Sequence, residues 1–218
     1  MTLRLGILTT HPIQYQVPWF RALSKEPGVE LEVLYCMLPD ASQQGSGFGV
    51  KFQWDIPLMD GYRYRVLENR APEPAVTTFW GCDTPQIDAI VRDGQWDAFI
   101  VNGWVAKSCL QLLWACRRYG VPCIVRGESN AIRPRAAWKG WIHRALLRQY
   151  AAFLAIGTQN EAFYRANGVP QERIFSAPYC VENDRFAQPE PRCERACPFT
   201  FLFSGKLIDK KRPLDALV

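Results

Sequence analysis

Three basic side chains follow a short apolar run late in the sequence, and their types suit a phosphate group. Residues 199–203 are apolar and β-prone, which predicts a buried strand, and the chain turns at Gly205. Lys206, Lys211 and Arg212 lie between this turn and the predicted start of a helix. A helix start offers unpaired N–H groups, lysine a mobile charge and arginine a two-pronged donor. These residues could hold a diphosphate without a metal ion, or form a solvated basic turn.

Polar side chains also follow three predicted strands, at the edge where parallel sheets bind their ligands. The candidates for ligand binding or catalysis at this edge are His11, Gln14, Tyr15, Asn102, Trp104, Arg126 and Glu128. Because the carboxyl ends of parallel strands meet at one edge, we expect these side chains to converge.

Two of these residues are candidates for catalysis. The Glu128 carboxylate could accept a hydrogen bond from a hydroxyl group, act as a base, or stabilise positive charge in a transition state. The alternative is an ion pair of Glu128 with Arg126 or Arg133 that only positions the loop. His11 could contact a ligand or pack at the start of a helix. Asn102 is expected to act as an orienting donor.

The elements that must position these residues alternate between strand and helix. Apolar runs predict strands at 3–9, 29–36, 62–67, 98–101, 122–126, 152–156 and 173–176. Helical periodicity predicts helices at 12–23, 85–91, 105–119, 137–150 and 158–168. Pro12 suits a first helical position, and Thr158 with Glu161 has the spacing of a capping box. The alternation predicts an α/β fold with a doubly wound, Rossmann-like parallel sheet. No Gly-x-Gly-x-x-Gly follows the first strand, which disfavours a nicotinamide or flavin domain.

Composition narrows the class of protein further. The chain has 218 residues and a net charge of +5, which is too weakly basic to argue for a nucleic-acid partner. The eight cysteines form no Cys-x-x-Cys pair and only two histidines are present, so we expect no metal site. Cys36, Cys109, Cys116 and Cys123 fall on apolar faces and are expected to be buried. No apolar stretch reaches the length of a membrane span, and we expect a cytoplasmic protein.

The expected domain boundary lies in a stretch rich in proline and charge. We expect a first Rossmann-like domain at 1–177, a linker at 178–198, and the first strand and helix start of a second, incomplete domain at 199–218.

The run from Gly205 to Lys211 resembles the Gly-Arg-Leu-x-x-x-Lys-Gly pattern that opens the C-terminal domain of retaining GT-B glycosyltransferases of the family-4 type. Lys206 stands for the arginine of that pattern and Arg212 for its last glycine. Residues 177–186 resemble the family's Pro-x-Gly-Val-Asp-x-x-x-Phe element, and residues 48–62 resemble the acceptor loop of a bacterial subgroup. The likeness covers nearly the whole chain.

This resemblance implies a metal-independent transfer of a sugar from a nucleotide diphosphate sugar to a hydroxyl of a polysaccharide or lipid-linked precursor, with retention and without a cofactor. Gly205, Lys206, Lys211 and Arg212 would hold the donor diphosphate. Gln14, Tyr15, Asn102, Trp104 and Arg126 would bind the acceptor, and Glu128 stands where many relatives have a catalytic histidine. The family also uses a Glu-x7-Glu element deeper in the donor domain, past the strand and helix start expected at 199–218, so we expect this portion alone to be inactive. A non-catalytic glycan-binding module and a nucleotide-sugar epimerase of GT-B fold are the alternatives.

The helix expected around 135–148 has a basic side. Trp138, Trp141 and Ile142 lie among Arg135, Lys139, His143, Arg144 and Arg148. This pattern suits peripheral contact with an anionic membrane. The plainer interpretation, which the sequence favours, is a helix packed on the sheet with a solvated charged face.

Overall fold

The computed structural model describes residues 2–44, 51, 54, 56–132, 137–187, 202–203, 207 and 209–216. The chain divides into two compact units. The first comprises residues 1–38 and 56–181, and the second comprises residues 39–55 and 182–218. Each unit is described by itself.

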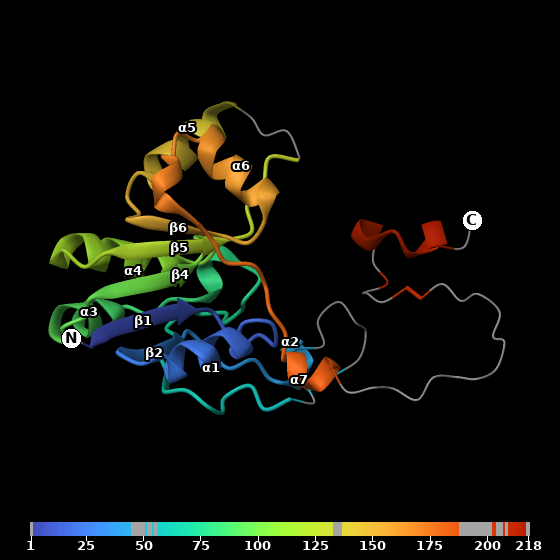
Figure 1. Ribbon diagram of the computed structural model, residues 1–218, viewed down its shortest axis with the longest axis horizontal. Helices are drawn as coiled ribbons and strands as arrows, with labels where there is room; N and C mark the ends of the chain where they lie inside the picture. The colour runs from blue at the N-terminus through green and yellow to red at the C-terminus, as the bar shows by residue number, and fades with distance from the viewer. Residues whose placement is uncertain are drawn as a thin grey trace. The chain divides into compact units, whose positions relative to one another are not determined.

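The first unit is built on a parallel sheet of seven strands in the order β3-β2-β1-β4-β5-β6-β7 (Figure 1). The strands are β1 (Leu3–Thr9), β2 (Val29–Tyr35), β3 (Tyr64–Val66), β4 (Ala98–Asn102), β5 (Cys123–Gly127), β6 (Ala152–Ala155) and β7 (Ile174–Ser176). All six pairings are parallel. The prediction of a doubly wound, Rossmann-like α/β sheet is confirmed, because the order reverses between β1 and β4.

Helices cover this sheet and close two apolar clusters. They are α1 (Val17–Lys25), α3 (Ile87–Asp93), α4 (Lys107–Tyr119), α5 (Ala137–Leu147) and α6 (Thr158–Ala166), with 3₁₀ turns η1 (Phe79–Gly81) and η2 (Gln171–Arg173). Phe20 of α1 packs with Ile7 and Val33 on one face of the sheet. Leu112 of α4 packs with Leu8 and Val101 in the other cluster. The central strands β1, β4 and β5 are buried along most of their length because helices lie on both faces of the sheet.

Two helix starts differ from the sequence expectation. The first helix begins at Val17 rather than at Pro12, and a turn precedes it in which the Ile13 carbonyl accepts from the backbone N–H groups of Gln16 and Val17. Pro18, not Pro12, takes the early helical position that proline favours. The predicted capping box is wrong, because Thr158 is already helical and the preceding Gly157 makes no side-chain cap.

The helix end at Gly120 is as predicted. Gly120 has φ +71°, and its N–H bonds the Cys116 carbonyl at the end of α4. The predicted burial of Cys36, Cys109, Cys116 and Cys123 is also confirmed. Cys193 and Cys197 lie outside the described residues. None of the helices within the described ranges has the length and apolar character needed to cross a bilayer.

The second unit contains short elements only, as far as the structure describes it. They are α2 (Ala41–Gln44), α7 (Asn183–Phe186), and the 3₁₀ turns η3 (Asp209–Lys211) and η4 (Pro213–Ala216). A buried strand was predicted at 199–203; residues 199–201 lie outside the described residues, and Leu202 and Phe203 are exposed and carry no strand assignment. A strand needs a hydrogen-bonded neighbour, and the described part of this unit holds no other strand. Two 3₁₀ turns stand where a helix start was predicted.

Candidate functional site

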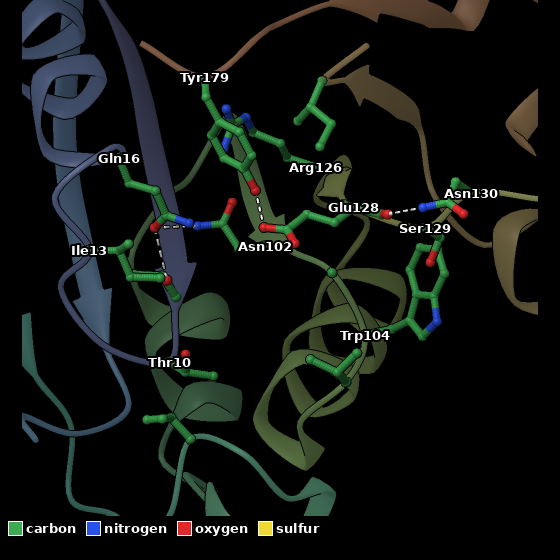
Figure 2. Close-up of a pocket in the computed structure, with 16 residues that line it drawn as sticks. Thr10, Ile13, Gln16, Asn102, Trp104, Arg126, Glu128, Ser129, Asn130 and Tyr179 are labelled. Atoms are coloured by element: carbon green, nitrogen blue, oxygen red, sulfur yellow. Dashed lines mark hydrogen bonds between the residues drawn. The ribbon is translucent and has the colours of Figure 1, made fainter. Parts of the chain in front are cut away.

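A pocket of about 370 Å³ opens at the carboxyl ends of β1, β4 and β5, beside the point where the strand order reverses (Figure 2). Most of its lining residues lie at or just after the ends of these strands; Ile156 follows β6, Val76 comes from the loop between β3 and α3, and Tyr179 from the segment after β7. The lining residues are Thr9, Thr10, Ile13, Gln16, Val76, Asn102, Gly103, Trp104, Val105, Arg126, Gly127, Glu128, Ser129, Asn130, Ile156 and Tyr179. A parallel sheet places its ligand site at this position.

A buried amide network forms one wall of the pocket. Gln16 is only 5% exposed, and its Oε1 accepts from Thr9 Oγ1 at 3.2 Å and from Asn102 Nδ2 at 3.0 Å. Oδ1 of Asn102 is buried and has no hydrogen-bond partner among the described residues. A buried acceptor without a partner costs stability, so this wall has capacity for one more donor. The network is neutral and suits hydroxyl groups.

Glu128 is the carboxylate of the pocket and follows the end of β5. The Tyr179 phenol donates a hydrogen bond to Glu128 Oε1, across 51 residues of sequence (Figure 2). Asn130 Nδ2 donates to the Glu128 backbone oxygen at 3.5 Å. The salt bridges of the described residues include none to Glu128, so the expected pairing with Arg126 does not form, and Arg133 lies outside those residues.

Arg126 is a buried cation beside this carboxylate. The residue is 4% exposed, and its Nη2 donates to the carbonyl oxygens of Ala177 and Pro178 at 3.3 Å each. Its guanidinium carbon lies 4.6 Å from the centre of the Tyr179 ring and 5.2 Å from that of Trp19. Burial lowers the pKa of Arg126 from its usual value. Arg126 therefore connects the end of β5 with the chain that follows β7.

The loop after β5 is fixed from behind by α6. Asn160 is 3% exposed; its amide donates to the Ser129 carbonyl at 2.7 Å and accepts from the Ile156 N–H at 3.2 Å. A Cβ atom on Gly127 would lie 3.3 Å from the Tyr164 hydroxyl and 3.7 Å from the Trp104 ring. The Trp104 ring stacks on Phe163 with centroids 6.3 Å apart. The aromatic wall and the Ser129 backbone are thus held in place before a ligand binds.

The structure brings together four of the seven residues predicted for this edge. Asn102, Trp104, Arg126 and Glu128 line the pocket, whereas His11, Gln14 and Tyr15 are not among its lining residues. Tyr15 instead packs edge-on against the Tyr179 ring, with centroids 4.4 Å apart.

The His11 side chain contacts Thr10 and does not line the pocket. Its Nδ1 lies 2.9 Å from Thr10 Oγ1, and burial lowers the pKa of His11 to about 4. The imidazole is therefore neutral at pH 7. His11 is thus outside the pocket lining, and it does not lie at a helix start either, because α1 begins six residues later.

Sequence reasoning missed Thr9, Gln16 and Tyr179. Gln16 lies two residues beyond Gln14, and the helix start predicted at Pro12 hid its position before the helix. Ser129 and Asn130 belong to the polar run after β5 that the sequence placed at this edge, although neither was given a role. Tyr179 carried no local signal.

The residues predicted to hold a donor diphosphate belong to the second unit. Gly205 and Lys206 lie outside the described residues. Lys211 is exposed, and Arg212 is also exposed and pairs with Asp215, with Nε 2.6 Å from Oδ2. Their assignment to phosphate stays a prediction.

Comparison with known proteins gives a family and a fold. The family described as "Glycosyl transferase 4-like domain" matches residues 19–180. No curated protein sequence matches significantly. Among solved structures, the chain is similar to a UDP-N-acetylglucosamine 2-epimerase, with a TM-score of 0.52 and 12% identity over 81% of this chain and 48% of that one. It is also similar to Anabaena HepE in complex with UDP and glucose, with a TM-score of 0.52 and 9% identity over 84% of this chain and 46% of that one. The chain thus spans just under half the length of either structure.

Proposed function

This chain belongs to the glycosyl transferase 4-like family, and from that premise we propose that it binds the acceptor for a GT-B glycosyltransferase. The complete reaction would move a sugar from a nucleotide diphosphate sugar to an acceptor hydroxyl, with retention at the anomeric carbon. The acceptor class would be a polysaccharide or a lipid-linked precursor.

The observation that carries this proposal is the chemistry of the pocket. Its polar walls are mainly neutral amides and hydroxyls, from residues such as Gln16, Asn102, Ser129 and Asn130, beside the indole of Trp104. One carboxylate and one arginine are the charged groups of the lining. Amides and hydroxyls match the donors and acceptors of a sugar, and an aromatic ring packs against its apolar face. A diphosphate would call for several cations, which this lining does not contain.

Glu128 is the residue that we assign to the chemistry. Its carboxylate can accept a hydrogen bond from the attacking hydroxyl, take up its proton, or stabilise the positive charge that develops on the sugar ring. Asn102 would orient the acceptor through its amide. His11 would act by packing and remain neutral.

The donor would be held elsewhere, by the basic run of the second unit. Gly205, Lys206, Lys211 and Arg212 are proposed to bind the diphosphate and to stabilise it as it departs, with neither a metal ion nor a cofactor. The HepE structure, which contains UDP and glucose, is the reason to test UDP-glucose first.

Peripheral membrane contact through α5 is also proposed, and it would suit a lipid-linked acceptor. Trp138, Trp141 and Ile142 are 60%, 73% and 56% exposed, so this face is not packed on the sheet as the plainer interpretation expected. Exposed indoles beside cations are typical of helices that lie at a membrane surface.

The test uses the full-length protein, UDP-glucose and a panel of methyl glycosides. Acceptor-dependent release of UDP, with a glycoside product that keeps the donor's anomeric configuration by NMR, would support the proposal. Release of UDP without any acceptor, together with an epimerised sugar, would favour an epimerase. Saturable binding of a glycoside without turnover would favour a non-catalytic module.

A further inference from the structure

Tyr179 lines the pocket, and its phenol is hydrogen-bonded to Glu128, the candidate catalytic carboxylate. It reaches the pocket from the segment after β7 and donates a hydrogen bond to Glu128 Oε1 (Figure 2). We infer that Tyr179 is a positioning residue, which holds one oxygen of the Glu128 carboxylate and leaves the other for a hydroxyl of the sugar ligand. This inference rests on the proposed function and extends it to a residue that the sequence did not indicate.

Tyr179 is itself held from several sides. Arg126 donates to the carbonyl oxygens of Ala177 and Pro178, which come directly before Tyr179. The same guanidinium lies 4.6 Å from the centre of the Tyr179 ring, and the Tyr15 ring packs edge-on at 4.4 Å. A side chain fixed in this way can fix a second one.

Glu128 needs such support because its own side chain is exposed. A free glutamate samples many rotamers, and fixing it in one of them costs conformational entropy. The phenol of Tyr179 supplies the contact that selects one position. A residue whose reactive atoms are placed before the ligand arrives does not have to be ordered during the reaction.

The same geometry acts on the proton of the Tyr179 phenol. Burial, followed by the nearby Glu128 carboxylate, raises the pKa of Tyr179 from its usual value, so the phenol keeps its proton at neutral pH. An ionised carboxylate has no proton to donate, and the phenol is therefore the donor. Among the described residues, no hydrogen bond reaches Glu128 Oε2. That oxygen is available to accept from a ligand hydroxyl.

The structure also offers a matched control. The Tyr119 phenol donates to Asp88 Oδ2 at 2.7 Å, which is the same type of bond between α4 and α3, and neither residue lines the pocket. Tyr179→Phe and Tyr119→Phe thus remove the same group from two places. Thermal unfolding of both variants establishes that each is folded.

The first measurement does not depend on turnover. In the full-length protein with ¹³Cζ-labelled tyrosine, Tyr179→Phe and Tyr119→Phe assign the two resonances. Glu128→Gln should move the Tyr179 resonance and lower the pH at which this phenol titrates, and should leave the Tyr119 resonance in place. If neither the chemical shift of Tyr179 nor its titration changes in Glu128→Gln, the inference is overturned.

The second measurement is transfer from UDP-glucose to the methyl glycosides. Tyr179→Phe should lower kcat by about tenfold or more, the size expected for losing a hydrogen bond to a charged group, with an unchanged KM for the donor. Tyr119→Phe should retain the wild-type rate. Wild-type kcat in Tyr179→Phe would overturn the inference. If the wild type transfers no sugar while Tyr179 still responds to Glu128→Gln, the proposed function fails and the positioning of the carboxylate stands.

Discussion

At the scale of single residues, Glu128 combines three features that the account requires. It follows the end of β5, lines the pocket, and accepts a hydrogen bond from Tyr179. The other lining groups within its reach are neutral, apart from the Arg126 cation, which is engaged with backbone carbonyls and aromatic rings. The carboxylate is therefore the group on which a substitution should have the largest effect on rate.

Glu128→Gln keeps the size and most of the polarity of the side chain but removes its charge and its basicity. We expect kcat of the full-length protein to fall by about 10²- to 10⁴-fold, the range for loss of a general base or of a charge-stabilising group. Steady-state kinetics with UDP-glucose and a methyl glycoside would measure this loss.

The control for this change is Glu161→Gln. Glu161 pairs with Arg165 on the surface of α6 at 3.8 Å, and a pair of that kind contributes little to stability. The Glu161→Gln variant should therefore keep the wild-type kcat. A Glu128→Gln variant as active as Glu161→Gln would contradict the assignment of Glu128.

His11 should make the stability of the protein depend on pH. Its pKa is about 4 in the folded protein because of burial, and near 6.5 when unfolded. Between these values the unfolded state binds more protons, so the stabilising contribution of neutral His11 is complete above about pH 6.5 and is lost as the pH falls toward 4. Urea unfolding across this range should show that the free energy of unfolding of the wild type falls by about 3 kcal/mol as the pH is lowered. This fall should be absent from His11→Asn.

The other histidine provides the control for this measurement. His143→Asn retains His11, so its free energy of unfolding should still show the decrease at low pH that His11 causes. Equal slopes of stability against pH in the wild type and in His11→Asn would show that His11 is not held neutral by the fold.

At the scale of elements, α5 is attached to the first unit by one side only. His143 lies against the rings of Trp104 and Phe163, with centroids 6.0 and 5.5 Å away, and Leu147 is buried. The opposite side exposes Trp138 and Trp141, and Lys139, one turn before His143, is exposed as well. An exposed pair of indoles needs an explanation that packing inside this unit does not supply.

Neutralising the basic side of α5 tests membrane contact. Lys139→Gln, Arg144→Gln and Arg148→Gln together should weaken binding to vesicles of phosphatidylglycerol and phosphatidylcholine by about two orders of magnitude, at about 1 kcal/mol for each cation. Sedimentation with the vesicles would measure this. Arg117→Gln with Arg118→Gln, two exposed cations of α4, should have little effect. Unchanged binding by the α5 variant would reject this surface.

The elements also show what the sequence could and could not predict. The central strands β2, β1, β4 and β5 were predictable because each is an apolar run that is mostly buried, and alternation with helices then indicated a parallel sheet. The residues at which helices begin were harder to predict. Pro12 and Pro18 both fit a first-turn position, and only the turn at Ile13 decides between them.

Contacts distant in sequence account for the rest of the site. The misplaced helix start led to Gln14 in place of Gln16. The hydrogen bond from Tyr179 to Glu128 joins segments 51 residues apart, and no local sequence pattern predicts it. Asn102, Trp104, Arg126 and Glu128 were predictable because each follows a strand directly. Thr158 failed as a cap for a local reason, since the helix already includes it.

In the whole molecule, the proposed reaction is divided between two regions. The first unit contains the neutral pocket, and the basic residues proposed for the donor belong to the second. The chain spans 48% and 46% of the two solved structures to which it is similar. The complete reaction is therefore a proposal and not an observed property of this chain.

The most direct test of the account is whether the pocket binds the acceptor rather than the donor. Calorimetric titration of the full-length protein would compare UDP with a methyl glycoside, in the wild type and in Asn102→Ala, which removes the amide beside Gln16. We expect glycoside affinity to fall about tenfold in Asn102→Ala, the loss for one hydrogen bond in a buried site, and UDP affinity not to change. A loss of UDP affinity with unchanged glycoside binding would contradict this expectation and make the pocket the nucleotide site.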